Sequence, residues 1–125
     1  MLRVLFVGLG GFVGAVSRYG LSMAFPLKDK LSFPFTTLLI NFIGAFCMGL
    51  ILHFSEKIFP LHSYLLVFLT IGVLGGFTNF PTFSMETINL LEGGKIALGL
   101  LYAVTSVLLC LGGVLLGKGI IRLFC

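Results

Sequence analysis

The chain has 125 residues, of which 58% are hydrophobic and only 10% are charged, and its mean hydropathy is +1.19. This composition excludes an ordinary soluble domain, because stretches this apolar are typical of membrane spans. The net charge of +4 is then best assigned to loop residues near lipid headgroups, and it does not indicate nucleic-acid binding. The three cysteines are an odd number, and Cys47 and Cys110 lie in apolar segments, so we predict no disulfide set.

Four apolar segments follow one another along the chain. The first covers about residues 2–25, the second 35–54, the third 61–91 and the fourth 96–117. The second and fourth have the length of about 20 residues that a helix needs to cross roughly 30 Å of hydrocarbon. We therefore expect an all-α membrane protein with a single domain over residues 1–125 and four transmembrane helices.

The first two segments each carry a polar residue at an unusual place. Arg18 lies inside the first segment, where it either snorkels to the interface or forms an electropositive vestibule that attracts anions. Asn41 is the only amide in the second segment, where it either joins two helices or donates hydrogen bonds into a pore.

Pairs of small residues four positions apart predict close contacts between helices. These pairs are Gly10 and Gly14, Ala45 and Gly49, and Gly113 and Gly117.

The third segment contains a break. No charged residue occurs from Ile58 to Met85, yet glycines, a proline and short polar side chains interrupt the apolar run over residues 75–84. These residues favour an unwound helix, and lipid cannot satisfy the backbone groups that unwinding exposes. The break must therefore face protein, water or an ion, as the ion sites of transporters do.

Two phenylalanines flank this break. Phe80 and Phe83 are three residues apart and share a helix face, where they either pack ordinarily or turn their electropositive ring edges toward an anion. Exposed N–H groups at the start of the second half-helix would add positive partial charge. Exposed carbonyls at the end of the first half-helix could hold a cation.

The fourth segment places Tyr102 and Ser106 on one helix face, because they are four residues apart. The sequence contains no metal-binding spacing, phosphate-binding loop or nucleophile beside a base, so we predict that the chain is not an enzyme. We place all four acids at or outside the ends of the spans: Asp29, Glu56, Glu86 and Glu92. This placement favours passive conduction over proton exchange.

The basic residues are almost balanced between the two membrane sides. With four crossings, one side holds Arg3, Lys57, Lys118 and Arg122, and the other holds Lys28, Lys30 and Lys95, with Arg18 leaning toward it. An excess of basic residues on one side normally sets the orientation of a membrane protein, and this chain has almost none. The chain could therefore insert both ways or pair with an inverted copy. Four helices are too few to enclose a pore, and we therefore expect a dimer.

Three motifs together resemble those of one known family. They run from Gly10-Gly11 to Arg18-Tyr19, from Asn41 to Phe46, and from Gly75-Gly76 to Glu86, and Tyr102 and Ser106 complete the pattern. In order and spacing, along the whole chain, they resemble the CrcB/Fluc fluoride channels.

The resemblance implies an antiparallel dimer in the cell membrane that exports F⁻ passively through two pores. It implies that Asn41 lines the pore, that Phe80 and Phe83 give ring edges to F⁻, and that the backbone carbonyls of Gly75 and Thr78 hold a structural Na⁺ at the dimer centre. It also places further residues near the ion pathway: Arg18, Thr82, Ser84, Glu86, Tyr102 and Ser106.

The chain departs from the family pattern at four positions. Asn79 and Pro81 stand where the family usually has hydroxyl residues, and Cys110 and Val114 do so along the fourth segment. Two explanations stay open: a homodimer with a modified pore, or a heterodimer whose second homologous subunit supplies the missing hydroxyls. A non-conducting partner subunit is a further alternative. A small four-helix drug exporter is disfavoured, because we expect no carboxylate inside a span.

Overall fold

The computed structural model describes residues 1–25 and 33–125. Lys28 and Lys30, which entered the predicted charge balance, and Asp29 lie outside the described residues.

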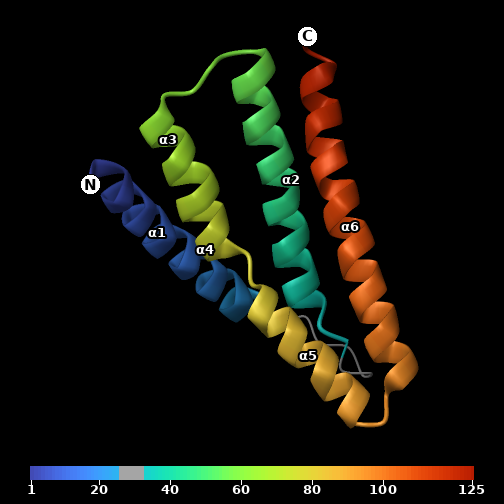
Figure 1. Ribbon diagram of the computed structural model, residues 1–125. Coiled ribbons are helices and arrows are strands. Elements are labelled where there is room, and N and C mark those ends of the chain that lie inside the picture. The colour runs from blue at the N-terminus through green and yellow to red at the C-terminus, as the bar shows by residue number, and fades with distance from the viewer. Residues whose placement is uncertain (26–32) are drawn as a thin grey trace.

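Within residues 1–25 and 33–125, four helical spans are long and apolar enough to cross a membrane, as predicted. The first is α1 (Leu2–Ala24), the second is α2 (Phe35–Lys57) and the fourth is α6 (Ile96–Arg122). The third extends over Ser63–Glu92 in several pieces. Both termini lie at the same end of the bundle, as expected for a chain that crosses a membrane an even number of times (Figure 1).

The third span is broken, and the break is narrower than the predicted residues 75–84. The span consists of α3 (Ser63–Val67), the π-helix η1 (Phe68–Leu74), α4 (Gly75–Phe77) and α5 (Phe80–Glu92). Only two residues leave the helix: Thr78 is extended (φ −76°, ψ 156°) and Asn79 follows (φ −146°, ψ 89°). Pro81 lies in the first turn of α5, where the missing N–H costs nothing, because these amides have no helical partner.

Glycines allow α1 to approach the first half of the third span at backbone distance. A Cβ on Gly72 would lie 2.8 Å from the Gly10 Cα, and one on Gly76 would lie 2.6 Å from the Gly11 carbonyl oxygen. Gly14 meets the Val73 backbone in the same way. Gly75 and Gly76 lie in the helix α4 and do not unwind it. Gly76 instead allows close packing against α1.

A second glycine contact joins α2 to α6, which lie side by side and run in the same direction (Figure 1). Gly49 abuts the backbone of Val114, and Gly117 abuts that of Phe46. The predicted contacts of Gly49, Gly113 and Gly117 are thus confirmed. Ala45, in contrast, lines a cavity.

Candidate functional site

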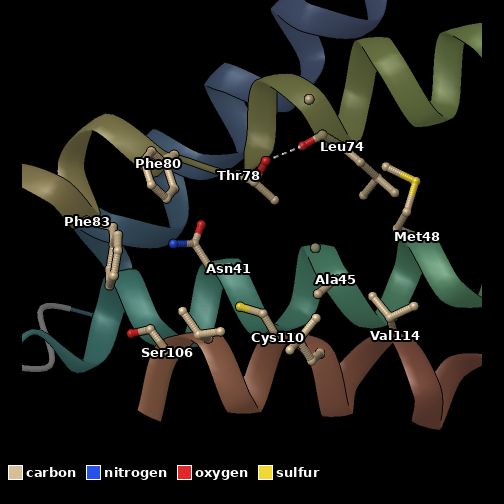
Figure 2. A pocket seen from close by; sticks show the side chains of 14 residues that line it. Asn41, Ala45, Met48, Leu74, Thr78, Phe80, Phe83, Ser106, Cys110 and Val114 are labelled. Atoms are coloured by element: carbon tan, nitrogen blue, oxygen red, sulfur yellow. Dashed lines mark hydrogen bonds between the residues drawn. The ribbon is translucent and has the colours of Figure 1, made fainter. Parts of the chain in front are cut away.

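A cavity of about 430 Å³ lies where α2, α6 and the break in the third span face one another. Its wall is mostly apolar, and it brings together six residues that the sequence analysis selected: Asn41, Gly75, Thr78, Phe80, Phe83 and Ser106. We call this space the central cavity. Figure 2 shows that Asn41 reaches into it from α2, opposite the break and above Ser106 on α6.

The orientation of the Asn41 amide is set by the break. The backbone N–H of Asn79 donates to Asn41 Oδ1 at 3.0 Å. Because a backbone N–H can only donate, the oxygen of Asn41 must face it and the NH₂ group must point elsewhere. In Figure 2 the Asn41 nitrogen lies on the side of Phe80 and Phe83. Asn41 therefore offers two N–H donors to the central cavity.

Asn79 also closes the start of α5. Its Oδ1 accepts from the Thr82 backbone N–H at 3.2 Å, and its Nδ2 donates to the Thr82 hydroxyl. This is an N-cap, in which a short side chain replaces the helical partner that the first amides lack. Since Pro81 has no N–H and the Thr82 amide is taken, the start of α5 offers an anion fewer donors than the sequence analysis expected.

The two phenylalanines are neighbours but differ in exposure. Their ring centroids are 5.5 Å apart, and both rings line the central cavity. Phe83 also packs on Tyr102, whose side chain is fully buried, with centroids 5.2 Å apart. Phe80 is 73% exposed on the surface of the single chain. An aromatic ring this exposed beside a cavity is open to contact with another chain.

The α6 wall of the central cavity changes from polar to apolar along the helix. Ser106 is 5% exposed, and within the described part of the chain its hydroxyl lies near that of Tyr102 without a hydrogen bond of good geometry. Buried hydroxyls normally have partners, so this one can bind a ligand in the cavity. One and two turns further on, Cys110 and Val114 line the same wall. The polar stretch is therefore as short as the sequence predicted.

Glu86 lies inside the bundle, contrary to our prediction that it stands at or outside the end of a span. It is in the middle of α5, where Oε1 accepts from the Thr37 hydroxyl and Oε2 from the Tyr102 hydroxyl, both at 2.8 Å. A hydropathy profile cannot place this carboxylate, because two donors on other helices make its position tolerable. Because this carboxylate lies within a span, the reason given above against a small four-helix drug exporter no longer holds.

A second cavity of about 280 Å³ lies on the other side of the break and is lined by more polar groups. We call it the vestibule. Arg18 lines it together with Ser22, Thr37, Asn79 and Thr82. Asn79 lines the vestibule while its backbone binds Asn41, which lines the central cavity. These two asparagines therefore lie at the junction of the two spaces.

The break also redirects the amides that would otherwise bond two carbonyls. In a continuous helix, the Asn79 N–H would bond the Gly75 carbonyl and the Thr82 N–H would bond that of Thr78. Here these amides donate to the side chains of Asn41 and Asn79 instead. Both carbonyl-bearing residues line the central cavity. Oxygen atoms of this kind suit a hard cation, so the donor set fits the predicted Na⁺ site.

The chain matches one protein-family model, described as CrcB-like protein, Camphor Resistance (CrcB), over residues 5–118. It is 48% identical over 118 residues to a fluoride-specific ion channel FluC of Ruminiclostridium cellulolyticum, covering 94% of this chain and 91% of the relative. A protein of the same name from Magnetococcus marinus is 40% identical over 122 residues, covering 98% and 99%. One from Geotalea daltonii is 44% identical over 112 residues, covering 89% and 90%.

This chain belongs to the CrcB-like family. As a CrcB-like protein with four spanning helices, it is a multi-pass membrane protein.

The predicted pathway residues of this CrcB-like protein do not all gather in one place. Arg18 and Thr82 line the vestibule, while Glu86 and Tyr102 form the hydrogen-bond network behind the central cavity. Ser84 lines neither space, since its hydroxyl donates to the Phe80 carbonyl on its own helix.

Sequence reasoning missed Thr37, which holds Glu86 and lines the vestibule. Only the folded pairing of α2 with α5 reveals this role.

Proposed function

We propose that this CrcB-like protein is a subunit of a fluoride-specific ion channel of the cell membrane, which lets F⁻ leave the cytoplasm passively. The observation that carries the proposal is the donor set of the central cavity. The NH₂ group of Asn41 and the hydroxyl of Ser106 line a mostly apolar space. The family relatives named fluoride-specific ion channels support the same function.

The chemistry of this cavity suits a small, strongly hydrated anion. Neutral N–H and O–H donors can replace water around F⁻, and the ring edges of Phe80 and Phe83 add weak positive potential. Among the described residues, no Lys or Arg lines the central cavity, so none of them would trap the ion by a fixed charge. Arg18 in the vestibule would instead raise the local concentration of anions before they enter.

Two copies in opposite orientation would complete the pathway. The central cavity opens on the surface of the single chain, where Phe80 is 73% exposed. A second chain packed on this face would cover the ring and enclose the cavity. The nearly balanced basic residues of the sequence support an inverted arrangement, because neither side has the excess that fixes orientation.

A structural Na⁺ would be held by the carbonyl oxygens of Gly75 and Thr78, with the partner supplying its own. Bound there, the ion would fix the break and neutralise carbonyl dipoles at the centre of the dimer. The Thr78 side chain has other contacts: its hydroxyl donates to the Leu74 carbonyl at 3.0 Å.

Na⁺ dependence tests this site. We expect that replacing Na⁺ by N-methyl-D-glucamine lowers the melting temperature of the purified dimer and slows F⁻ efflux. Thr78→Ala should keep this Na⁺ response, because the carbonyl remains. Equal melting temperatures of the wild type with and without Na⁺ would contradict the site.

The proposed function is tested by F⁻ efflux from liposomes that contain only this purified chain, measured with a fluoride electrode. We expect F⁻ efflux far above that of empty liposomes, and no Cl⁻ efflux. F⁻ efflux at the level of empty liposomes, from protein that is dimeric and folded, would contradict a self-sufficient channel.

A second candidate is a subunit that conducts only beside a homologous partner. The observation that favours it is the apolar end of the α6 wall, where Cys110 and Val114 line the central cavity. A partner with hydroxyls at these positions would extend the polar stretch. Efflux that requires co-reconstitution with a homologous second chain would support this candidate and exclude the first.

A further inference from the structure

Asn79 has contacts on both sides of the break, and no other described residue joins the two cavities in this way. Its side chain caps α5 through the Thr82 N–H, its carbonyl accepts from the Phe83 N–H at 3.4 Å, and its own N–H donates to Asn41. One residue therefore connects the start of the second half-helix to the amide that faces the central cavity.

The cap determines where the Asn79 N–H points. Asn79 is one of only two non-helical residues in the break, and the one helical bond that it accepts, from the Phe83 N–H, is long at 3.4 Å. The two hydrogen bonds from its side chain to Thr82 therefore add the main further restraint on its φ of −146° and ψ of 89°. Without them, the residue could rotate and its N–H would leave Asn41 Oδ1. The Asn41 amide would then be free to turn its oxygen toward the cavity and repel an anion.

Pro81 makes this cap more important. It removes one amide from the first turn of α5, so the Thr82 N–H is the donor that an N-cap at this terminus can satisfy. A sequence comparison interprets Asn79 and Pro81 as two lost hydroxyls. The structure shows instead that the Asn79 side chain caps α5.

We propose that Asn79 is the positioning residue of the ion pathway in this chain. By capping α5 at Thr82, it holds its own N–H against Asn41 Oδ1 and so keeps the Asn41 NH₂ group facing the anion at the junction of the vestibule and the central cavity. This inference rests on the proposed fluoride function, but the contacts from Asn79 to Asn41 can be tested without conduction.

Three variants separate the cap from a general effect on stability. Asn79→Ala removes the cap, Asn79→Ser keeps a short oxygen that can accept from the Thr82 N–H, and Asn89→Ala changes an exposed asparagine further along α5. We expect Asn79→Ala to slow F⁻ efflux by roughly tenfold, Asn79→Ser to stay within about threefold of the wild type, and Asn89→Ala to be unchanged.

A spectroscopic measurement shows whether Asn79 acts through Asn41. The chain has three asparagines, Asn41, Asn79 and Asn89, so ¹⁵N-asparagine labelling gives three side-chain NH₂ signals in an NMR spectrum. We expect the Asn41 signal to shift when NaF is added and not when NaCl is added. In folded Asn79→Ala this signal should move or broaden and lose its response to F⁻, whereas Asn79→Ser should keep both.

The outcomes distinguish the two proposals. A folded Asn79→Ala protein whose Asn41 signal and F⁻ response match the wild type would overturn the positioning role. Loss of the Asn41 response in folded Asn79→Ser would overturn the role of the cap. A wild type whose Asn41 signal ignores F⁻ and that does not conduct would contradict the proposed function, while the position of the Asn41 signal in Asn79→Ala would still test the contact.

Discussion

The two faces of the third span differ sharply. On one side, η1 and α4 lie against α1 with Gly10, Gly72 and Gly76 in backbone contact. On the other side, the break faces α2 and α6 across a cavity of about 430 Å³. The same span therefore packs tightly against α1 on one face, and on the other face it borders the cavity of the proposed ion pathway.

This difference shows how a broken helix can be stable in lipid. The glycine contacts with α1 hold the first half of the span, while α5 is held by its cap and by packing on α6. The exposed polar groups of the break can then face the cavity rather than lipid. The predictions below test this division, from the largest expected effect to the smallest.

The largest effect is expected from adding a side chain where α1 contacts η1. A Cβ in Gly10→Ala would lie 2.5 Å from the Phe68 carbonyl oxygen and 2.9 Å from the Gly72 Cα, so α1 must separate from η1. We expect a loss of about 3 kcal/mol or more of stability and little folded protein in size-exclusion chromatography. The control is Gly8→Ala on the same helix, since nothing lies within 4 Å of its Cβ. Equal melting temperatures for both variants would contradict the tight contact.

The next largest effect is expected from removing the aromatic rings that line the central cavity. Phe83→Ile and Phe80→Ile remove a ring edge from the central cavity, and we expect each to slow F⁻ efflux by about a hundredfold without unfolding the protein. Phe12→Ile, which changes an exposed ring on α1, serves as the control. Wild-type efflux in both cavity variants would exclude a role for the rings.

A smaller effect is expected at the α6 wall. Ser106→Ala removes a buried hydroxyl that lines the central cavity, and F⁻ efflux should fall by about tenfold. Ser84→Ala should leave efflux unchanged, because that hydroxyl bonds to its own helix. The comparison fails if the Ser84 variant loses as much flux as the Ser106 variant.

Much of the fold could be predicted from the sequence, because hydropathy and span length determine the crossings. The position of the break was predicted less well, because Gly75 and Gly76 are helical. The π-helix η1 had no signal in the sequence. The conformation of these glycines and of η1 depends on contacts with another helix, and a local sequence pattern does not contain such contacts.

The site was predicted as a group of residues but not as a network. The resemblance to the fluoride channels placed Asn41, Phe80, Phe83 and Ser106 in one pathway, and the structure brings them to one cavity. The orientation of Asn41 depends on an amide 38 positions away, and that of Glu86 on hydroxyls from two other helices. The capping role of Asn79 could have been found, since asparagine is favoured at the start of a helix.

The most direct test of the account is the variant Asn41→Asp in the liposome efflux assay. Aspartate has nearly the same shape, and its oxygen can still accept from the Asn79 N–H, but it replaces the NH₂ donor by a second acceptor with negative charge. The account predicts a folded protein that has lost F⁻ efflux. Wild-type F⁻ efflux from folded Asn41→Asp would show that the Asn41 amide does not bind the ion, and the account would be wrong.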